Sequence, residues 1–158
     1  MDRPKPNKIT DEKVALAKAE NYCAYQERSQ QEVRDKLYEW GLYPSAIENI
    51  IARLIENNFL NEERFAIAYA TGKLRQKGWG RIKIKQGLKL KKVSEPLIKK
   101  ALKNIDENEY LEILHKTIQK KRVTITEKVP YKRNYKLHQY ALSRGFEGDL
   151  IADVLRDE

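Results

Sequence analysis

The sequence predicts an all-α protein built from three tandem three-helix, helix-turn-helix-like repeats, which stack into an elongated, curved molecule. Three observations predict this fold class. Apolar residues recur at helical spacing in nine segments that capping residues, glycines and prolines separate. The charged fraction is 35%, as expected for helices with narrow buried stripes and wide solvated faces. The apolar pattern also repeats at two fixed shifts along the chain.

We expect four parts along the chain. A three-helix unit of about 45 residues buries little apolar surface alone and gains stability by stacking on its neighbours. The predicted parts are a flexible N-terminal tail (1–9), repeat 1 (10–59), the basic repeat 2 (60–105) and repeat 3 (106–158).

Local signals mark the helices of the first repeat. Thr10 is the expected cap of the first helix. Ser29 and Glu32 form a capping box, in which the Ser29 oxygen accepts from the Glu32 amide while Glu32 reaches back. The helix that they open ends at Gly41, and Pro44 fits the first turn of the third helix.

The other two repeats carry similar signals. Asn61 caps the fourth helix, which ends at Gly78, and Asp106 begins the seventh. Residues 121–130 are predicted to form a polar connector, part of which alternates like a strand. The remaining helices are predicted from Arg81 to Lys91, after the Ser94 cap, from Tyr131 to Gly145, and from Gly148 onward.

Apolar positions of the first repeat recur in the other two. A shift of 51 residues places Val33 on Ile84, and a shift of 104 places it on Leu137. The larger shift also places Gly41 on Gly145. Each match alone is weak, but matches at the same positions of the unit indicate a repeat.

Positive charge is concentrated in one segment of the chain. Residues 73–103 contain twelve basic residues and one acidic residue, Glu95, so this segment carries +11 while the whole chain carries +9. Concentrated like charge opposes folding and is tolerated best where a polyanion relieves it. The sequence therefore predicts contact with nucleic acid or with an acidic protein groove.

The predicted fifth helix carries basic residues along one line. Arg81, Lys85 and Lys89 recur every four residues beside buried positions, with Lys92 one turn further on. A purely solvated face normally mixes charges of both signs, so we favour functional contact. The predicted nucleic-acid or filament-binding residues are Lys73, Arg75, Lys77, Arg81, Lys83, Lys85, Lys89, Lys91, Lys92, Lys132, Arg133 and Lys136. Ile82 and Leu90 are expected to pack against adjoining repeats.

Aromatic residues accompany the basic ones at two places. Trp79 lies between two glycines, where it could stack on a base or fill the joint between helices. Tyr131, Tyr135 and Tyr140 lie among basic residues in an acid-free stretch, a combination that suits single-stranded nucleic acid. Tyrosines at helical spacing are also common in cores, so both interpretations stay open. The other tyrosines are assigned to packing.

Two arginines and the single cysteine are assigned structural roles. Arg28 and Arg64 recur at the joints of the repeats, where an arginine usually caps carbonyl groups or pairs with glutamate. Cys23 is expected to be a small buried residue. A single cysteine excludes an internal disulfide and suits a reducing compartment, so we expect a cytoplasmic protein.

The sequence offers no basis for catalysis. His115 and His138 stand alone, without the spacing of a metal site, and no glycine-rich phosphate loop or GxSxG motif is present. We therefore predict no catalytic residue, no cofactor and no metal. No apolar run approaches the length of a membrane span.

The chain resembles the bacterial RecX family of RecA regulators over about residues 14–156. The segment Asn58-Phe-Leu-Asn-Glu-Glu-Arg-Phe-Ala66 is its most specific feature. Glu27–Leu37, Lys77–Ile82 with Leu88, and Leu142–Phe146 add weight through their order and spacing. Two departures are Lys91-Lys92-Val93, where the family usually has Lys-Gly-Ile, and Gly87 inside the fifth helix.

The resemblance implies a regulator without enzymatic activity. Family members are crescents that lie in the groove of the RecA filament on single-stranded DNA and usually suppress its recombinase, ATPase and co-protease activities in repair, recombination and SOS control. The implied partners are the RecA filament and single-stranded DNA, with double-stranded DNA a further candidate, and the implied state is a monomer. A stand-alone nucleic-acid-binding protein is the alternative; a nuclease lacks the necessary residues.

Overall fold

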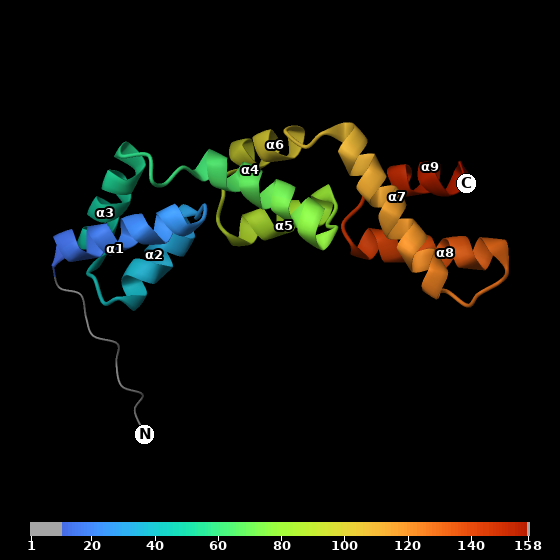
Figure 1. The fold of residues 1–158 in the computed structure, drawn as a ribbon, viewed down its shortest axis with the longest axis horizontal. Coiled ribbons are helices and arrows are strands. Elements are labelled where there is room, and N and C mark those ends of the chain that lie inside the picture. Colours follow the sequence, from blue (N-terminus) through green and yellow to red (C-terminus); the bar gives the residue numbers. More distant parts are fainter. Residues whose placement is uncertain (1–10, 158) are drawn as a thin grey trace, which may run out of the picture. The chain divides into compact units, whose positions relative to one another are not determined.

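The computed structural model describes residues 11–157, which form helices joined by short connections and contain no strand (Figure 1). The predicted tail and the Thr10 cap lie outside the described residues. The first helix is capped instead by Asp11, whose carboxylate accepts from the Lys13 amide. The elements are α1 (Glu12–Tyr25), α2 (Gln30–Glu39), α3 (Pro44–Glu56), α4 (Glu62–Gly72), the π-helical turn η1 (Lys73–Lys77), α5 (Arg81–Leu90), α6 (Glu95–Lys103), α7 (Glu107–Thr124), α8 (Pro130–Ser143) and α9 (Gly148–Arg156).

The described chain divides into two compact units. The first contains residues 11–66 and 91–93, and the second contains 67–90 and 94–157. The predicted all-helical class is confirmed for residues 11–157. The elongated, curved arrangement of the repeats stays a prediction.

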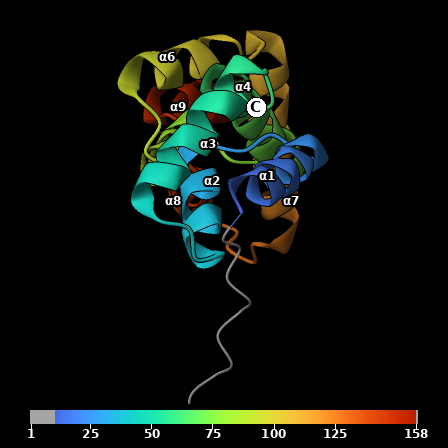
Figure 2. The same cartoon turned by 90° about the vertical axis from the view of Figure 1, so that its left-hand side faces the viewer.

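In the first unit, α1, α2 and α3 pack pairwise into a three-helix bundle (Figures 1 and 2). The apolar stripes predicted from helical spacing form its core, with buried Ala15, Val33, Leu37, Ile50 and Leu54 among its members. The Ser29–Glu32 capping box is confirmed, with both of its hydrogen bonds at 3.0 Å.

Two arginines fix the joints of the first unit. Arg28 Nε donates to the Tyr22 carbonyl at 3.0 Å, and the guanidinium lies 3.8 Å from the centre of the Tyr22 ring. Arg64 Nε donates to Glu27 Oε1 at 2.5 Å, while its terminal nitrogens donate to residues at the end of α3. These contacts confirm the structural role predicted for both arginines.

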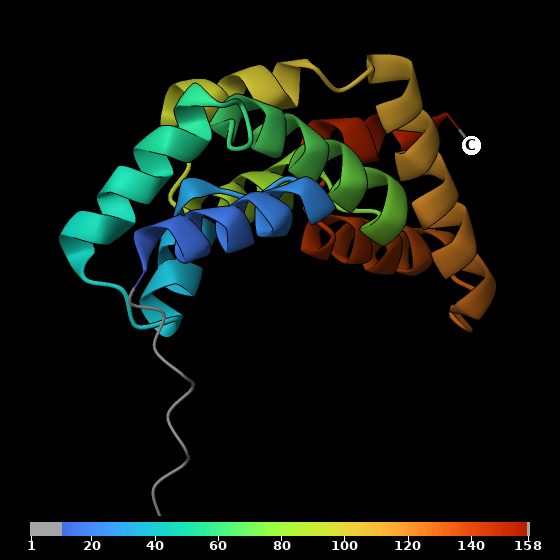
Figure 3. The ribbon, with the colours of Figure 1, turned by 60° about the vertical axis from the view of Figure 1, so that its left-hand side comes forward.

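In the second unit, α5 packs on α6, and α8 packs on both α7 and α9 (Figures 1 and 3). The η1 turn packs on α7. The repeat positions predicted as core are confirmed, because Ile84, Leu88 and Leu137 are fully buried. The predicted connector 121–130 is partly wrong: α7 continues through Thr124, so only residues 125–129 connect it to α8.

Glycines permit two close approaches inside the second unit. A Cβ on Gly80 would overlap the Gly145 carbonyl, and the Gly80 amide donates to the Arg144 carbonyl at 2.8 Å. A Cβ on Gly87 would overlap the Tyr69 hydroxyl. Glycine inside a helix costs up to about 1 kcal/mol relative to alanine, and this contact explains why α5 tolerates one.

Candidate nucleic-acid and filament interface

The sequence of α5 divides the helix into a buried stripe and a basic surface. Ile84 and Leu88 are fully buried, whereas the positions around them carry Lys83, Lys85 and Lys89. Buried residues four apart fix the rotation of the helix, so Lys85 and Lys89 lie on one flank of the buried stripe and Lys83 on the other. The structure therefore places these three lysines on partly or fully exposed positions.

Two apolar residues share the outer surface of α5. Ile82 is 47% exposed and Leu90 is 83% exposed. The prediction that they pack against adjoining repeats is wrong for Leu90, and Ile82 is covered only in part. Tyr25, Tyr38 and Tyr43 are likewise well exposed, so their assignment to packing is wrong.

The predicted line of basic residues ends with α5. The helix stops at Leu90, and Lys92 has φ 59°, in the left-handed region that favours glycine. Lys92 therefore does not continue the line of Lys85 and Lys89. Lys91 Nζ lies 3.7 Å from Glu32 Oε2, within the first unit.

Acidic residues from other elements neutralise part of the basic segment. Arg75 holds Glu109 through two hydrogen bonds of 2.5 and 3.1 Å, and Lys89 Nζ lies 3.2 Å from Glu95 Oε1. The hydrogen bonds from these partners lower the carboxyl pKa of Glu109 and Glu95. The basic segment therefore contains few acidic residues in its sequence, but the fold brings acidic side chains next to it.

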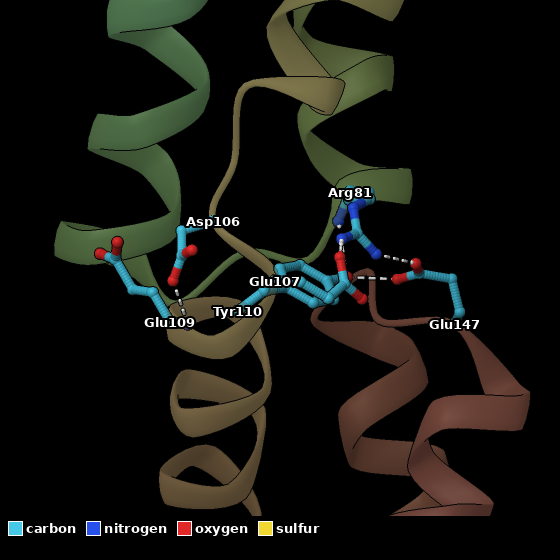
Figure 4. A network of polar contacts seen from close by, with 6 residues as sticks. All are labelled: Arg81, Asp106, Glu107, Glu109, Tyr110 and Glu147. Carbon is cyan, nitrogen blue, oxygen red and sulfur yellow. Dashed lines mark hydrogen bonds and ion pairs between the residues drawn. The ribbon is translucent and has the colours of Figure 1, made fainter.

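Arg81 takes part in a structural joint at the start of α5. Its side chain is 20% exposed and binds Glu147 at 2.6 Å and Glu107, with the guanidinium 3.9 Å from the centre of the Tyr110 ring (Figure 4). Desolvation by burial lowers the Arg81 pKa, but its hydrogen bond to Glu147 and the nearby charges more than offset this, so the pKa is raised. These ion pairs neutralise the Arg81 charge within the chain, and its contact with a partner stays a prediction.

Tyr110 is the buried centre of this joint. Its hydroxyl accepts from the Arg81 amide at 3.1 Å and donates to the Glu147 carboxylate, and its ring lies 5.3 Å from the Phe146 ring (Figure 4). Burial and the hydrogen bond to Glu147 raise the Tyr110 pKa. Sequence reasoning placed Tyr110 in the core but missed the network, because its carboxylates are distant in sequence.

Trp79 lies half-buried between two cations. Lys73 Nζ and Lys83 Nζ are each 4.9 Å from the centre of a Trp79 ring. Such contacts contribute roughly 0.5–1 kcal/mol at exposed sites. They hold both ammonium groups beside the indole, while base stacking by Trp79 stays a prediction. Lys77 is exposed at the end of η1.

A second basic and aromatic surface follows the first turns of α8. Tyr131 and Tyr135 are 73% and 65% exposed, and Lys132 and Lys136 are also exposed, whereas Arg133 is half-buried. Lys136 Nζ lies 3.8 Å from Glu127 Oε2 on the preceding connector. The four exposed side chains are therefore available to a ligand, although an acidic residue lies beside them.

Other kinds of site find little support within residues 11–157. No group of three or more His, Cys, Asp or Glu side chains lies close enough to hold a metal ion. None of the described helices is both long and apolar enough to cross a membrane. Cys23 is buried, and desolvation raises the pKa of its thiol to about 11.

Comparisons with known proteins agree on one family. Three family models match, described as the first, second and third three-helix domains of RecX, over residues 15–54, 61–102 and 107–155. The regulatory protein RecX of Haemophilus influenzae is 31% identical over 136 residues, which cover 85% of this chain and 88% of that protein. The Clostridium perfringens protein of the same name is 35% identical, and this chain spans 61% of its length.

A solved structure has the same fold. The crystal structure of RecX from Lactobacillus salivarius superposes with a TM-score of 0.83 and 24% identity, covering 92% of this chain and 95% of that one. A second crystal structure, of a regulatory protein RecX, gives a TM-score of 0.82 over 93% of this chain.

Proposed function

Because the chain belongs to the RecX family of regulatory proteins, we propose that it binds the filament that RecA recombinase forms on single-stranded DNA and lowers the activities of that filament. The affected activities are ATP hydrolysis, recombination and co-protease action in SOS control. Family membership over all three domains is the observation that carries this proposal. The chain acts without catalysis, as a monomer in the cytoplasm, and its repeats divide as residues 10–59, 60–105 and 106–158.

The basic surface of α5 supports contact with a polyanion. Lys85 and Lys89, four residues apart, project from one flank of a helix whose Ile84 and Leu88 are buried. Lys83 lies on the other flank, beside Trp79. DNA phosphates or an acidic groove of the filament would relieve the mutual repulsion of these lysines. The exposed Ile82 and Leu90 beside them add apolar area that suits a protein groove better than DNA alone.

The surface at the start of α8 supports a second candidate, stand-alone binding of nucleic acid. Exposed Tyr131 and Tyr135 beside Lys132 and Lys136 combine stacking platforms with cations. This function needs no recombinase partner.

Co-sedimentation separates the two functions. The chain is mixed either with naked single-stranded DNA or with RecA filaments assembled on that DNA beforehand. Filament binding predicts far stronger retention on the filaments at equal DNA concentration. Equal retention on both would overturn the RecA proposal in favour of stand-alone binding.

A further inference from the structure

The second unit contains a basic pocket formed by η1, α7 and α8, which pack together there. Its volume is about 350 Å³, within the range of small-ligand pockets. Five of its lining side chains are basic, and none is acidic. The basic lining residues are Arg75, Lys77, Lys116, Lys120 and Arg144, and the aromatic one is Tyr140.

Much of this charge has no neutralising side chain in the pocket lining. Arg75 is held by Glu109, which lies outside the lining, and Arg144 donates to the main-chain carbonyl of Lys77. A carbonyl orients a guanidinium without cancelling its charge. With Arg75 paired, four cationic side chains still converge on the pocket, and a bound anion would stabilise them.

The backbone around the pocket is held in place. The η1 segment is a π-helical turn, which occurs rarely and frequently at functional sites. It ends at Gly78, with φ 65°, and the Trp79 amide donates to the Lys73 carbonyl at 3.1 Å. The bond from Arg144, which directly follows α8, ties the end of this turn to the end of that helix. The main chain at Lys77 is thereby held beside the pocket.

The α7 part of the lining contributes two exposed lysines on one face of that helix. Lys116 and Lys120 are four residues apart, so they lie on the same side of the helix, about one turn from each other. Like charges at this spacing destabilise a helix by roughly 0.2–0.5 kcal/mol, and the cations of η1 line the same pocket. An anion in the pocket would contact both sets.

The aromatic ring in the lining selects the class of anion. Tyr140 lines the pocket, and Lys121 Nζ lies 4.8 Å from the centre of its ring. Cations around an aromatic face are typical of sites for single-stranded nucleic acid, where phosphates meet the cations and a base can stack. An acidic peptide would use the cations but not the ring.

We infer that this pocket binds the phosphate backbone of single-stranded DNA, with Lys77, Lys116, Lys120 and Arg144 contacting phosphate and Tyr140 offering a base-stacking surface. None of Lys116, Lys120, Tyr140 and Arg144 belongs to the basic segment of the sequence. The inference deepens the proposed function, on which it rests for the choice of DNA as the ligand. It gives the DNA strand a binding site separate from the lysines of α5.

The test measures binding of a fluorescent oligothymidylate to the full chain alone, by anisotropy across a salt series. The double variant Lys116→Gln, Lys120→Gln removes two exposed charges from the pocket. The matched control Lys99→Gln, Lys103→Gln removes two exposed charges from α6, outside the pocket lining.

Loss of two phosphate contacts should reduce the slope of log K against log salt by about 1.4, which corresponds to roughly 25-fold weaker binding at 0.1 M salt. The control should match the unmodified chain. Equal slopes for the two double variants would overturn the inference. The inference would also be overturned if free ATP bound more strongly than the oligonucleotide. The same holds if polyglutamate of matched charge competed as well as unlabelled oligonucleotide.

The result does not depend on RecA, so the two proposals fail separately. If the pocket variant lowers the salt slope of DNA binding while the chain leaves the RecA ATPase rate unchanged, the DNA-binding role of the pocket is supported and the proposed function is contradicted. If the chain lowers the RecA ATPase rate but the two double variants have equal salt slopes, the proposed function is supported and the DNA-binding role of the pocket is contradicted.

Discussion

The substitution Tyr110→Phe tests the joint around Arg81 with little change in shape. It retains the ring that packs on Phe146 and removes a hydroxyl that donates to Glu147 and accepts from the Arg81 amide. A hydrogen bond to a charged group contributes about 1.5–3 kcal/mol, and an amide left without its partner costs about 1 kcal/mol or more. Water can reach the partly exposed carboxylate, so we expect unfolding free energy to fall by about 2 kcal/mol.

Urea unfolding followed by tryptophan fluorescence measures this loss. A Trp40→Phe background leaves Trp79, in the second unit, as the sole reporter. The control Tyr131→Phe alters a tyrosine that is 73% exposed and should change stability by less than about 0.5 kcal/mol. If Tyr110→Phe costs no more than this control, the joint does not stabilise the unit and the reasoning is refuted.

The same variant has a characteristic pH dependence. The Tyr110 pKa is raised in the folded state, so the folded chain holds this proton more tightly than the unfolded chain does. The stability from Tyr110 is therefore complete below about pH 10, the usual tyrosine pKa, and is lost as pH rises above it. The difference between the unmodified chain and Tyr110→Phe should shrink above pH 10, and a constant difference would contradict the buried hydrogen bond.

Three further substitutions or reactions test other features of the structure. Gly80→Ala should destabilise the second unit by about 1–3 kcal/mol, because its Cβ meets the Gly145 backbone. The control Gly72→Ala, with open space around the new Cβ, should instead stabilise by about 0.5–1 kcal/mol. If Gly80→Ala raised the melting temperature as the control does, the close contact with Gly145 would be contradicted. Lys92→Gly should raise unfolding free energy by about 0.5–1 kcal/mol, since it relieves a left-handed residue, and a loss would show that Lys92 is not strained. At pH 8 the Cys23 thiol should react with a disulfide reagent about 100-fold more slowly in the folded chain than in urea, because its pKa rises from 9.0 to about 11; equal rates would mean that the thiol is accessible.

The sequence was sufficient for the helical repeats because their signals are local. Val33, Ile84 and Leu137 occupy equivalent repeat positions and are all fully buried. The Ser29–Glu32 capping box involves residues three apart, and a short motif fixes its geometry. Periodicity and capping therefore predicted the element order.

The charge pattern was harder to interpret, since ion pairs join residues that are far apart in sequence. Arg75 and Glu109 are 34 residues apart, and Arg81 and Glu147 are 66 apart. A count of charges along the chain cannot include such partners. Lys116, Lys120 and Arg144 were missed as pocket cations for the same reason, because only the packing of η1 and α8 on α7 brings them together.

One departure from the family pattern had a structural meaning that the sequence alone did not give. The glycine usual at the position of Lys92 suits a backbone with positive φ, and the structure shows that Lys92 adopts this conformation. The resemblance identified the unusual residue, but only the backbone angle explained it.

The steady-state ATPase of RecA on single-stranded DNA, titrated with this chain, tests the central claim most directly. The chain should lower the rate, and the variant Lys85→Glu, Lys89→Glu should need at least about tenfold more protein, since it reverses the exposed charges of α5 but retains Arg81. The control Lys99→Glu, Lys103→Glu should act like the unmodified chain. An unchanged ATPase rate with the unmodified chain, or equal inhibition by both variants, would contradict the account.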